Sequence, residues 1–315
     1  MNLPAPDGVG CAAVIGTGTI GGSWAAHFLA RGLDVRAWDP APGAQDRLRR
    51  QVEEAWPVLA RLGLAPGADV GRLTWCADAA RALEGAQFVQ ESAPEKLEVK
   101  RALYEIFDRA LAPEAVMATS TSGLLVSELQ RGRRGAERYV LGHPFNPPHL
   151  IPLVEVLGGE HTAPEVVDWT LAFYEAHGKQ AVRLNREVPG HLVNRMQAAI
   201  WREAVDAVAS GLASVADVDK AIAYGPGLRW ALMGPHLVFH LAGGPRGMRG
   251  FLDHFGAPME SWWRDLRAAT LDDEVRARLV EGVEHEAGGR SVAELAAERD
   301  ALLVDLLELL ARSRR

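Results

Sequence analysis

The stretch Gly16-Thr17-Gly18-Thr19-Ile20-Gly21 decides the fold. A short apolar run at 11–15 precedes it, and apolar residues at helical spacing follow it as far as Gly32. This order predicts a strand, a glycine turn and a helix. Here the first glycine permits a tight turn, the second leaves room for a pyrophosphate, and the third lets the helix pack closely on the sheet. The free backbone N–H groups at the N-terminus of this helix can bind the phosphates. The stretch therefore predicts a dinucleotide-binding site.

Asp39 strengthens this prediction. It ends a second apolar run at 35–38, close to the offset of roughly 20 residues at which a carboxylate meets the ribose hydroxyls of the adenosine. Pro40 follows it where a binder of a 2′-phosphate would have a basic residue, and a carboxylate repels that phosphate. We therefore expect NAD as cofactor, and not NADP. The alternative is a structural turn followed by an unrelated acid.

Strand-like and helical segments alternate through the first part of the chain. Further short apolar runs lie at 88–90, 116–119, 139–141 and 151–156. One or two amphipathic helices are expected at 45–64, and a further helix at 97–111. This alternation predicts an α/β domain with a Rossmann-like, mostly parallel sheet covered on both faces. Strand-like runs stop near Pro189, so we expect a NAD-binding domain at 1–187 and an all-helical domain at 188–315.

Composition excludes several classes of function. The 315 residues are 48% hydrophobic and 24% charged, which is typical of a globular protein. The net charge of -7 and the interspersed acids and bases give no footprint for nucleic acid or an anionic membrane. We expect a cytoplasmic protein because no basic leader precedes an apolar stretch. Cys11 and Cys76 are the only cysteines, so neither a disulfide framework nor a metal site is expected.

Polar residues follow two of the predicted strands. Ser122 comes after the run at 116–119, and His143 comes after the run at 139–141. Because the carboxyl ends of parallel strands meet at one edge of a sheet, these side chains should converge. Glu155 interrupts the next aliphatic run, and a buried acid needs a partner.

These three residues suit the oxidation of an alcohol. Such a reaction needs a base for the hydroxyl proton, and a neutral imidazole serves near pH 7, so we assign His143 as the base. Glu155 would hold its tautomer and stabilise the imidazolium, and Ser122 would hydrogen-bond the substrate oxygen. The alternatives are a strand-end histidine satisfied by backbone, a solvent-facing acid on an edge strand and a serine that caps a helix.

At these residues the sequence resembles the 3-hydroxyacyl-CoA dehydrogenase superfamily. The segments that carry the resemblance are GTGTIG at 16–21, APEKLEVK at 93–100, STS at 120–122, GHPFNP at 142–147, LVEV at 153–156 and VPGHLVNR at 188–195. The resemblance implies that Asn194 joins Ser122 at the substrate oxygen and that the helical domain forms a homodimer. It implies a cofactor surrounded by further polar residues, which we take to be Glu95, Lys100, Ser120 and Asn146.

Within the superfamily, the segment Gly225-Pro226-Gly227-Leu228-Arg229-Trp230 is similar to that of L-carnitine and L-gulonate 3-dehydrogenases. Those substrates carry a free carboxylate, which a guanidinium binds in a bidentate fork, whereas a CoA thioester is neutral there. We therefore expect Arg229 to bind a small 3-hydroxy acid, with L-carnitine favoured. Phe145, Trp230 and Phe251 are the expected aromatic contacts, because aromatic faces receive a trimethylammonium group.

Several alternatives remain open. The substrate could be a 3-hydroxyacyl-CoA, such as 3-hydroxybutyryl-CoA, or L-gulonate, and Arg229 could instead pair with an acid at a dimer interface. A non-catalytic, crystallin-like structural protein on the same fold is the alternative from a different class.

Overall fold

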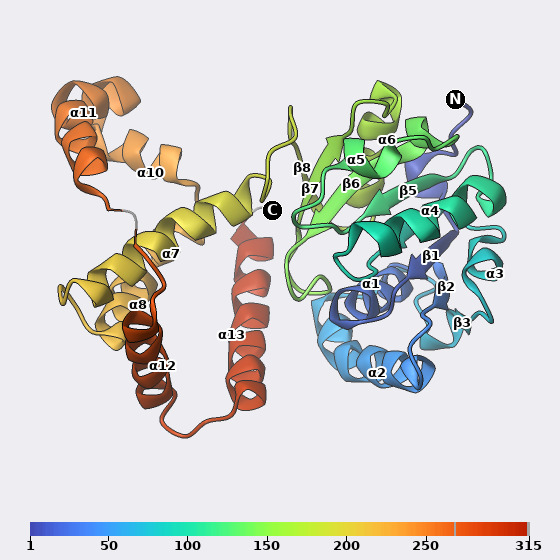
Figure 1. Cartoon of the computed structure of the whole chain (residues 1–315), viewed down its shortest axis with the longest axis horizontal. Helices are drawn as coiled ribbons and strands as arrows, with labels where there is room; N and C mark the ends of the chain where they lie inside the picture. The colour runs from blue at the N-terminus through green and yellow to red at the C-terminus, as the bar shows by residue number, and fades with distance from the viewer. Residues whose placement is uncertain (268, 314–315) are drawn as a thin grey trace. The chain divides into compact units, whose positions relative to one another are not determined.

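The computed structural model describes residues 1–267 and 269–313. The chain divides into two compact units, Met1–Val193 and Asn194–Arg315. The first contains a sheet covered by helices, and the described part of the second is helical (Figure 1). This confirms the predicted fold class, a Rossmann-like α/β domain followed by an all-helical one.

The sheet of the first unit has eight strands in the order β3-β2-β1-β4-β5-β6-β7-β8. Neighbouring strands run parallel except for β6 and β7, which are antiparallel. Their bounds are β1 Cys11–Ile15, β2 Asp34–Trp38, β3 Leu73–Trp75, β4 Phe88–Glu91, β5 Val116–Thr119, β6 Tyr139–Pro144, β7 Leu153–Gly158 and β8 Gln180–Arg183. The sequence did not predict β3 and β8, because such short runs with little apolar content give no periodic signal.

Helices cover both faces of this sheet, and the alternation of side chains along each strand explains how. In β1, Ala12 and Val14 pack into one apolar cluster, whereas Ala13 and Ile15 pack into another. The first cluster includes side chains of α1 Thr19–Ala30, α2 Ala44–Leu62 and α6 Pro164–Ala176. The second includes α3 Ala79–Leu83, α4 Leu97–Ala110 and α5 Val126–Gln130. A strand buried on both faces reads as a continuous apolar run, as β1 does.

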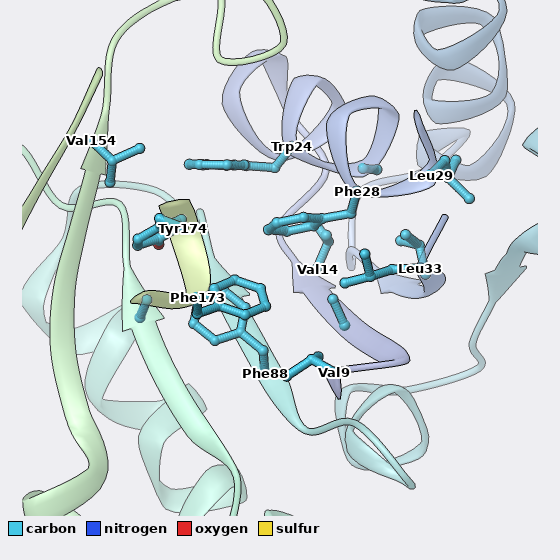
Figure 2. Packing of buried hydrophobic residues seen from close by; sticks show 14 of the residues in the cluster. Val9, Val14, Trp24, Phe28, Leu29, Leu33, Phe88, Val154, Phe173 and Tyr174 are labelled. Carbon is cyan, nitrogen blue, oxygen red and sulfur yellow. The ribbon is translucent and has the colours of Figure 1, made fainter. Parts of the chain in front are cut away.

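An aromatic core fixes α1 against the sheet. The Trp24 and Phe28 rings of α1 stack at 5.1 Å between centroids, and Phe88 of β4 stacks on Phe173 of α6 at 4.0 Å. Figure 2 shows these rings pointing toward one another between the helix and the strands. Large rings buried together contribute more than their area alone. Through α1 they hold the glycine turn that precedes it.

A buried lysine links α1 to the segment after β6. Lys179 is 2% exposed, and its Nζ lies 4.8 Å from the centroid of the Trp24 ring. Its ammonium donates to the carbonyl of Pro148 and, at 3.1 Å, to that of Ile151. Burial, with a smaller contribution from Arg31, lowers the pKa of Lys179 from 10.5 to about 7. The segment that leaves the carboxyl end of β6 is thus held by a group that titrates near neutral pH.

We expect Lys179 to make the free energy of unfolding depend on pH. Between pH 7 and pH 10.5 the unfolded chain holds this proton and the folded protein does not, so folding becomes more favourable as the pH rises through that window. Between pH 7 and pH 9 the free energy of unfolding should rise by about 2 kcal/mol more in the wild type than in Lys179→Met. Urea unfolding of both proteins at a series of pH values measures this difference. Parallel curves would show that the ammonium stays charged.

The second unit consists of helices among its described residues, and it buries little apolar surface. Its α-helices are α7 Val193–Ala209, α8 Val215–Tyr224, α9 Pro226–Trp230, α10 Pro235–Ala242, α11 Gly247–Asp265, α12 Asp273–Ala287 and α13 Val292–Ser313. Val193, the first residue of α7, is the last residue of the first unit. Among all the described residues, no helix combines the length and apolarity needed to cross a membrane.

Candidate active site

A large cleft opens beside the glycine turn of the first unit. Its volume is about 980 Å³, at the upper end of the range usual for small-molecule sites. Residues from the turn, the segment after β2, α2, the segment after β4 and α4 line it, among them Gly16, Thr17, Gly18, Thr19, Asp39, Arg47, Gln51, Ser92, Val99 and Ala102. This cleft lies where an open parallel sheet binds its ligands, beyond the carboxyl ends of the strands.

The glycines of the turn are required by its geometry. Gly16 has a φ of +84°, which L side chains rarely adopt, and a Cβ at Gly21 would lie 1.8 Å from the Gly16 carbonyl oxygen. A Cβ at Gly18 would meet no atom within 4 Å, so this glycine faces open space in the cleft. Thr19 begins α1, and Ile20 follows it, partly buried. The turn thus leaves room for a pyrophosphate at the N-terminus of α1, and these residues fit the expected cofactor.

Asp39 is held in the cleft by backbone amides. The Thr17 amide donates to its Oδ2 at 2.7 Å, and the Ala41 amide donates to its Oδ1 at 2.8 Å. The carboxylate therefore lies beside the glycine turn, with lone pairs left for further donors such as ribose hydroxyls.

We expect Asp39→Ala to weaken the binding of NAD more than that of NADP. The substitution removes an acceptor for the ribose hydroxyls and also removes the charge that repels a 2′-phosphate. Dissociation constants of both nucleotides for wild type and variant measure the change. A wild type that used both nucleotides equally well would contradict this role for Asp39.

His143 lies in β6 directly opposite Glu155 of β7, because the antiparallel register pairs the two residues. The Nδ1–H of His143 donates to Glu155 Oε2 at 2.8 Å. The other ring nitrogen, Nε2, then carries a lone pair and accepts from the Ser122 hydroxyl at 3.2 Å. His143 is 4% exposed and Glu155 is fully buried, so these two side chains are held in one geometry.

Glu155 receives two more hydrogen bonds at the start of α7. The amides of Leu192 and Val193 donate to its Oε1 at 3.0 and 2.8 Å. Burial by itself would raise the pKa of Glu155, but the hydrogen bonds from His143 and the two amides outweigh it, and the net pKa is lowered. Glu155 is thus an ionised acceptor that holds the proton of His143 on Nδ1. The proposed edge-strand alternative is wrong, because β8 pairs with the other side of β7.

Glu95 holds the turn that carries Ser122. Its Oε1 accepts from Thr121 Oγ1 at 2.6 Å and from the amides of Ser122 and Gly123 at 2.9 and 2.7 Å. Burial would raise the pKa of Glu95, but these hydrogen bonds and the Lys100 charge lower it. The side chain is still 43% exposed. Glu95 therefore positions Ser122 in addition to the place near the cofactor that the resemblance implies.

Lys100, which the resemblance implies lies near the cofactor, forms a buried ion pair with Glu91 in the structure. It is 1% exposed, and its ammonium donates to both oxygens of Glu91 at 2.7 and 3.0 Å. Glu91 also accepts from the Thr119 hydroxyl and the Ala93 amide. Lys100 therefore neutralises a buried acid that accepts from the amide of Ala93, a residue that lines the cleft. The sequence reasoning missed Glu91, although a carboxylate that ends a buried strand is a signal for a paired acid.

Ser120 lies between the cleft and the turn that carries Ser122. Its hydroxyl lies 2.9 Å from Ser92 Oγ, on the cleft wall, and accepts from Gln90 Nε2 at 2.8 Å. Asn146 is exposed, just beyond β6. Phe145 is half-buried and meets the His143 ring edge-on at 5.0 Å between centroids.

The remaining expected residues belong to the second unit. Asn194 lies in the first turn of α7, and Arg229 and Trp230 are exposed on α9. Arg229 has no acid within ion-pair distance among the described residues. Phe251 differs from expectation, because it is 8% exposed and stacks on both Phe239 and Phe255. It packs α10 against α11.

Two family models match successive parts of the chain. The model for the NAD binding domain of 3-hydroxyacyl-CoA dehydrogenase matches residues 11–188, and the model for the C-terminal domain of the same enzyme matches residues 190–278. The matched ranges together include the cleft, His143, Glu155 and Arg229.

Relatives and solved structures agree with these matches. The L-carnitine dehydrogenase of Streptomyces coelicolor is 53% identical over 310 residues, 98% of each chain. That of Burkholderia mallei is 46% identical over 299 residues, 95% of this chain and 93% of the relative. The structure of 5-formyl-3-hydroxy-2-methylpyridine 4-carboxylic acid 5-dehydrogenase, an NAD-dependent dismutase, superposes with a TM-score of 0.83 at 32% identity, covering 96% of this chain and 99% of that one. With its NAD-binding first unit and helical second unit, the chain belongs to the 3-hydroxyacyl-CoA dehydrogenase family.

Proposed function

We propose that this enzyme oxidises the 3-hydroxyl group of L-carnitine to 3-dehydrocarnitine with NAD, and that His143 is the general base. The observation that carries the proposal is the position of His143, whose Nε2 has a lone pair that can accept a proton while Nδ1–H donates to the buried Glu155. The 53% identity to an L-carnitine dehydrogenase over nearly the whole chain supports the choice of substrate.

The residues of the first unit would divide the work as follows. The cleft beside the turn at 16–21 would hold NAD, which would supply the hydride acceptor for the oxidation. His143 takes the hydroxyl proton on Nε2, and the ionised Glu155 stabilises the imidazolium that forms. The Ser122 hydroxyl, which donates to His143 Nε2 in the structure, would instead donate to the substrate oxygen and stabilise the charge on that oxygen. Asp39 and the turn at 16–21 hold the adenosine ribose and the pyrophosphate.

Arg229 would bind the substrate carboxylate. An exposed guanidinium with no ion partner among the described residues can offer its planar fork to a carboxylate. Trp230, on the same helix and 38% exposed, can offer a face to the trimethylammonium group. The Asn194 amide would donate a hydrogen bond to the substrate oxygen. Phe145 would pack against the substrate.

We also propose that the enzyme is a homodimer formed through the second unit. Soluble monomers rarely expose large contiguous apolar surfaces, yet many large apolar side chains of this unit are more than half exposed. They include Trp201, Leu212, Leu228, Leu232, Leu237, Leu241, Trp262, Trp263 and Leu302. A second copy of the chain would cover them, and sedimentation equilibrium measures the assembly.

A comparison of initial rates tests the substrate. Wild-type enzyme and NAD are mixed with L-carnitine, L-gulonate, 3-hydroxybutyrate or 3-hydroxybutyryl-CoA, and NADH is followed by absorbance. We expect the highest kcat/KM with L-carnitine. Preference for the thioester would assign the enzyme to the acyl-CoA branch, and no NADH with any substrate would favour a non-catalytic protein.

A further inference from the structure

The turn that leads into α7 contains a buried histidine in an unusual backbone conformation. His191 has a φ of +51° and is the one non-glycine residue with a positive φ among the described residues. The residue is buried, with an exposed fraction of 2%. Such a conformation is unfavourable for a residue with a Cβ and persists where the surroundings hold it in place, often at functional sites.

Three neighbours of His191 belong to the group of residues that we propose for catalysis, which consists of Ser122, His143 and Glu155 with the turns that hold them. Its Nε2 lies 3.1 Å from the Thr121 carbonyl oxygen, directly before Ser122. Its ring lies 5.1 Å from that of His143, tilted by 53°. Its left-handed backbone precedes the two amides that donate to Glu155. One residue thus touches the serine turn, the base and the turn that holds the acid.

The hydrogen bond assigns the tautomer of His191. A carbonyl oxygen only accepts, so Nε2 carries the proton and donates to Thr121. Nδ1 of the neutral ring then keeps a lone pair, and this buried nitrogen has no hydrogen-bond partner among the described residues. A second proton would add a buried N–H without an acceptor and a positive charge beside His143.

The surroundings also keep His191 uncharged. Burial lowers its pKa, and the charge of His143 lowers it further, whereas the Thr121 hydrogen bond, Glu155 and Glu95 act in the opposite direction. The net direction is down, so the ring stays neutral while its neighbour accepts and releases a proton. His191 therefore supplies geometry without competing for the substrate proton.

We propose that His191 is a positioning residue that ties the Ser122 turn to the amides holding Glu155 and thereby keeps His143 aligned for proton transfer. The inference rests on the proposed dehydrogenase function of the same site. No proton passes through His191, and no bond to it forms or breaks. The other reading is a buried histidine that stabilises the fold and leaves catalysis unaffected.

Two variants and a matched control separate these readings. His191→Phe keeps a ring beside His143 and removes the hydrogen bond to Thr121, whereas His191→Gly accepts the left-handed backbone and removes the ring. His177→Phe is the control, because His177 is also buried, at 6% exposed, and bonds a backbone carbonyl, that of Phe173, at 2.8 Å. No contact described for His177 reaches Ser122, His143 or Glu155.

We expect kcat to fall about tenfold or more in both His191 variants, while the dissociation constant of NADH stays within about twofold of wild type. His177→Phe should lower Tm without changing kcat. In a Glu155→Gln background, His191→Phe should cost much less than in the wild type, because a residue that acts through Glu155 is coupled to it. Unchanged kcat, or full additivity with Glu155→Gln, would overturn the proposal.

A spectroscopic measurement keeps this test independent of turnover. The Nδ1 proton of His143, bonded to the Glu155 carboxylate, should give a downfield proton resonance in wild type and in His177→Phe. In His191→Gly we expect that resonance to broaden or shift, because the amides that orient Glu155 lose their anchor. If the wild type oxidised no 3-hydroxy acid, the proposed function would fail, and this resonance would still decide the role of His191. An unaltered resonance in His191→Gly would overturn the positioning role.

Discussion

Replacing His143 with glutamine is expected to lower kcat by about two to four orders of magnitude. Glutamine fills a similar space in β6, but its amide cannot take the hydroxyl proton while the hydride leaves. The cofactor cleft is lined by other residues, so the loss should lie in turnover. Steady-state kinetics give kcat, and NADH fluorescence gives the dissociation constant, which should match that of the wild type.

Glu155→Gln is the companion variant. It keeps the shape of the acceptor opposite His143 but removes the charge that stabilises the imidazolium. Because Glu155 orients the base and does not exchange the proton, its replacement should cost less than that of His143. Near-normal turnover of His143→Gln would reject the proposed base. A greater loss in Glu155→Gln would reassign the dominant role to the acid.

Replacing Arg229 with methionine is expected to lower kcat/KM for free 3-hydroxy acids by at least about tenfold. A charge-assisted pair of this kind is worth roughly 1.5–3 kcal/mol, and each 1.4 kcal/mol corresponds to about one decade. The affinity for NAD should not change, because the glycine turn and Asp39 belong to the first unit. The measurement is kcat/KM of wild type and variant on L-carnitine and on 3-hydroxybutyryl-CoA.

Arg264→Met is a matched control for the loss of a surface charge. Arg264 lies on α11 of the same unit and is highly exposed. Its Nη1 lies 3.8 Å from Oε2 of Glu260, one helical turn earlier. Its replacement should leave kcat/KM unchanged. Equal carnitine kinetics in wild type and Arg229→Met would show that Arg229 does not bind the substrate carboxylate.

The quaternary ammonium group offers a further arm of the same experiment. If an aromatic face such as that of Trp230 receives it, L-carnitine should have a higher kcat/KM than its uncharged tert-butyl isostere. The difference should reflect a cation–π attraction of roughly 0.5–2 kcal/mol, which needs the charge. Equal rates for the two compounds would indicate an apolar pocket that recognises shape alone.

The amino-acid sequence was sufficient to predict the NAD-binding domain and the place of its cofactor site. The turn at 16–21 and Asp39 lie within one strand–helix–strand unit, where local backbone geometry and the spacing along the chain limit what the residues can contact. The apolar runs indicated most of the central strands because both of their faces are buried. The strand bounds at 11–15 and 116–119 agree with the structure to the residue.

The arrangement of the residues that we propose for catalysis became visible only in the folded protein. His143 and Glu155 face each other because β7 runs antiparallel to β6, and periodicity along one strand carries no information about the direction or register of its neighbour. The short strand β8 pairs with β7 and makes it an interior strand, and two amides from residues 192 and 193 orient Glu155. Those contacts, like the pairing of Lys100 with Glu91 and the placement of His191, join residues distant in the chain, and only the folded backbone brings such residues together.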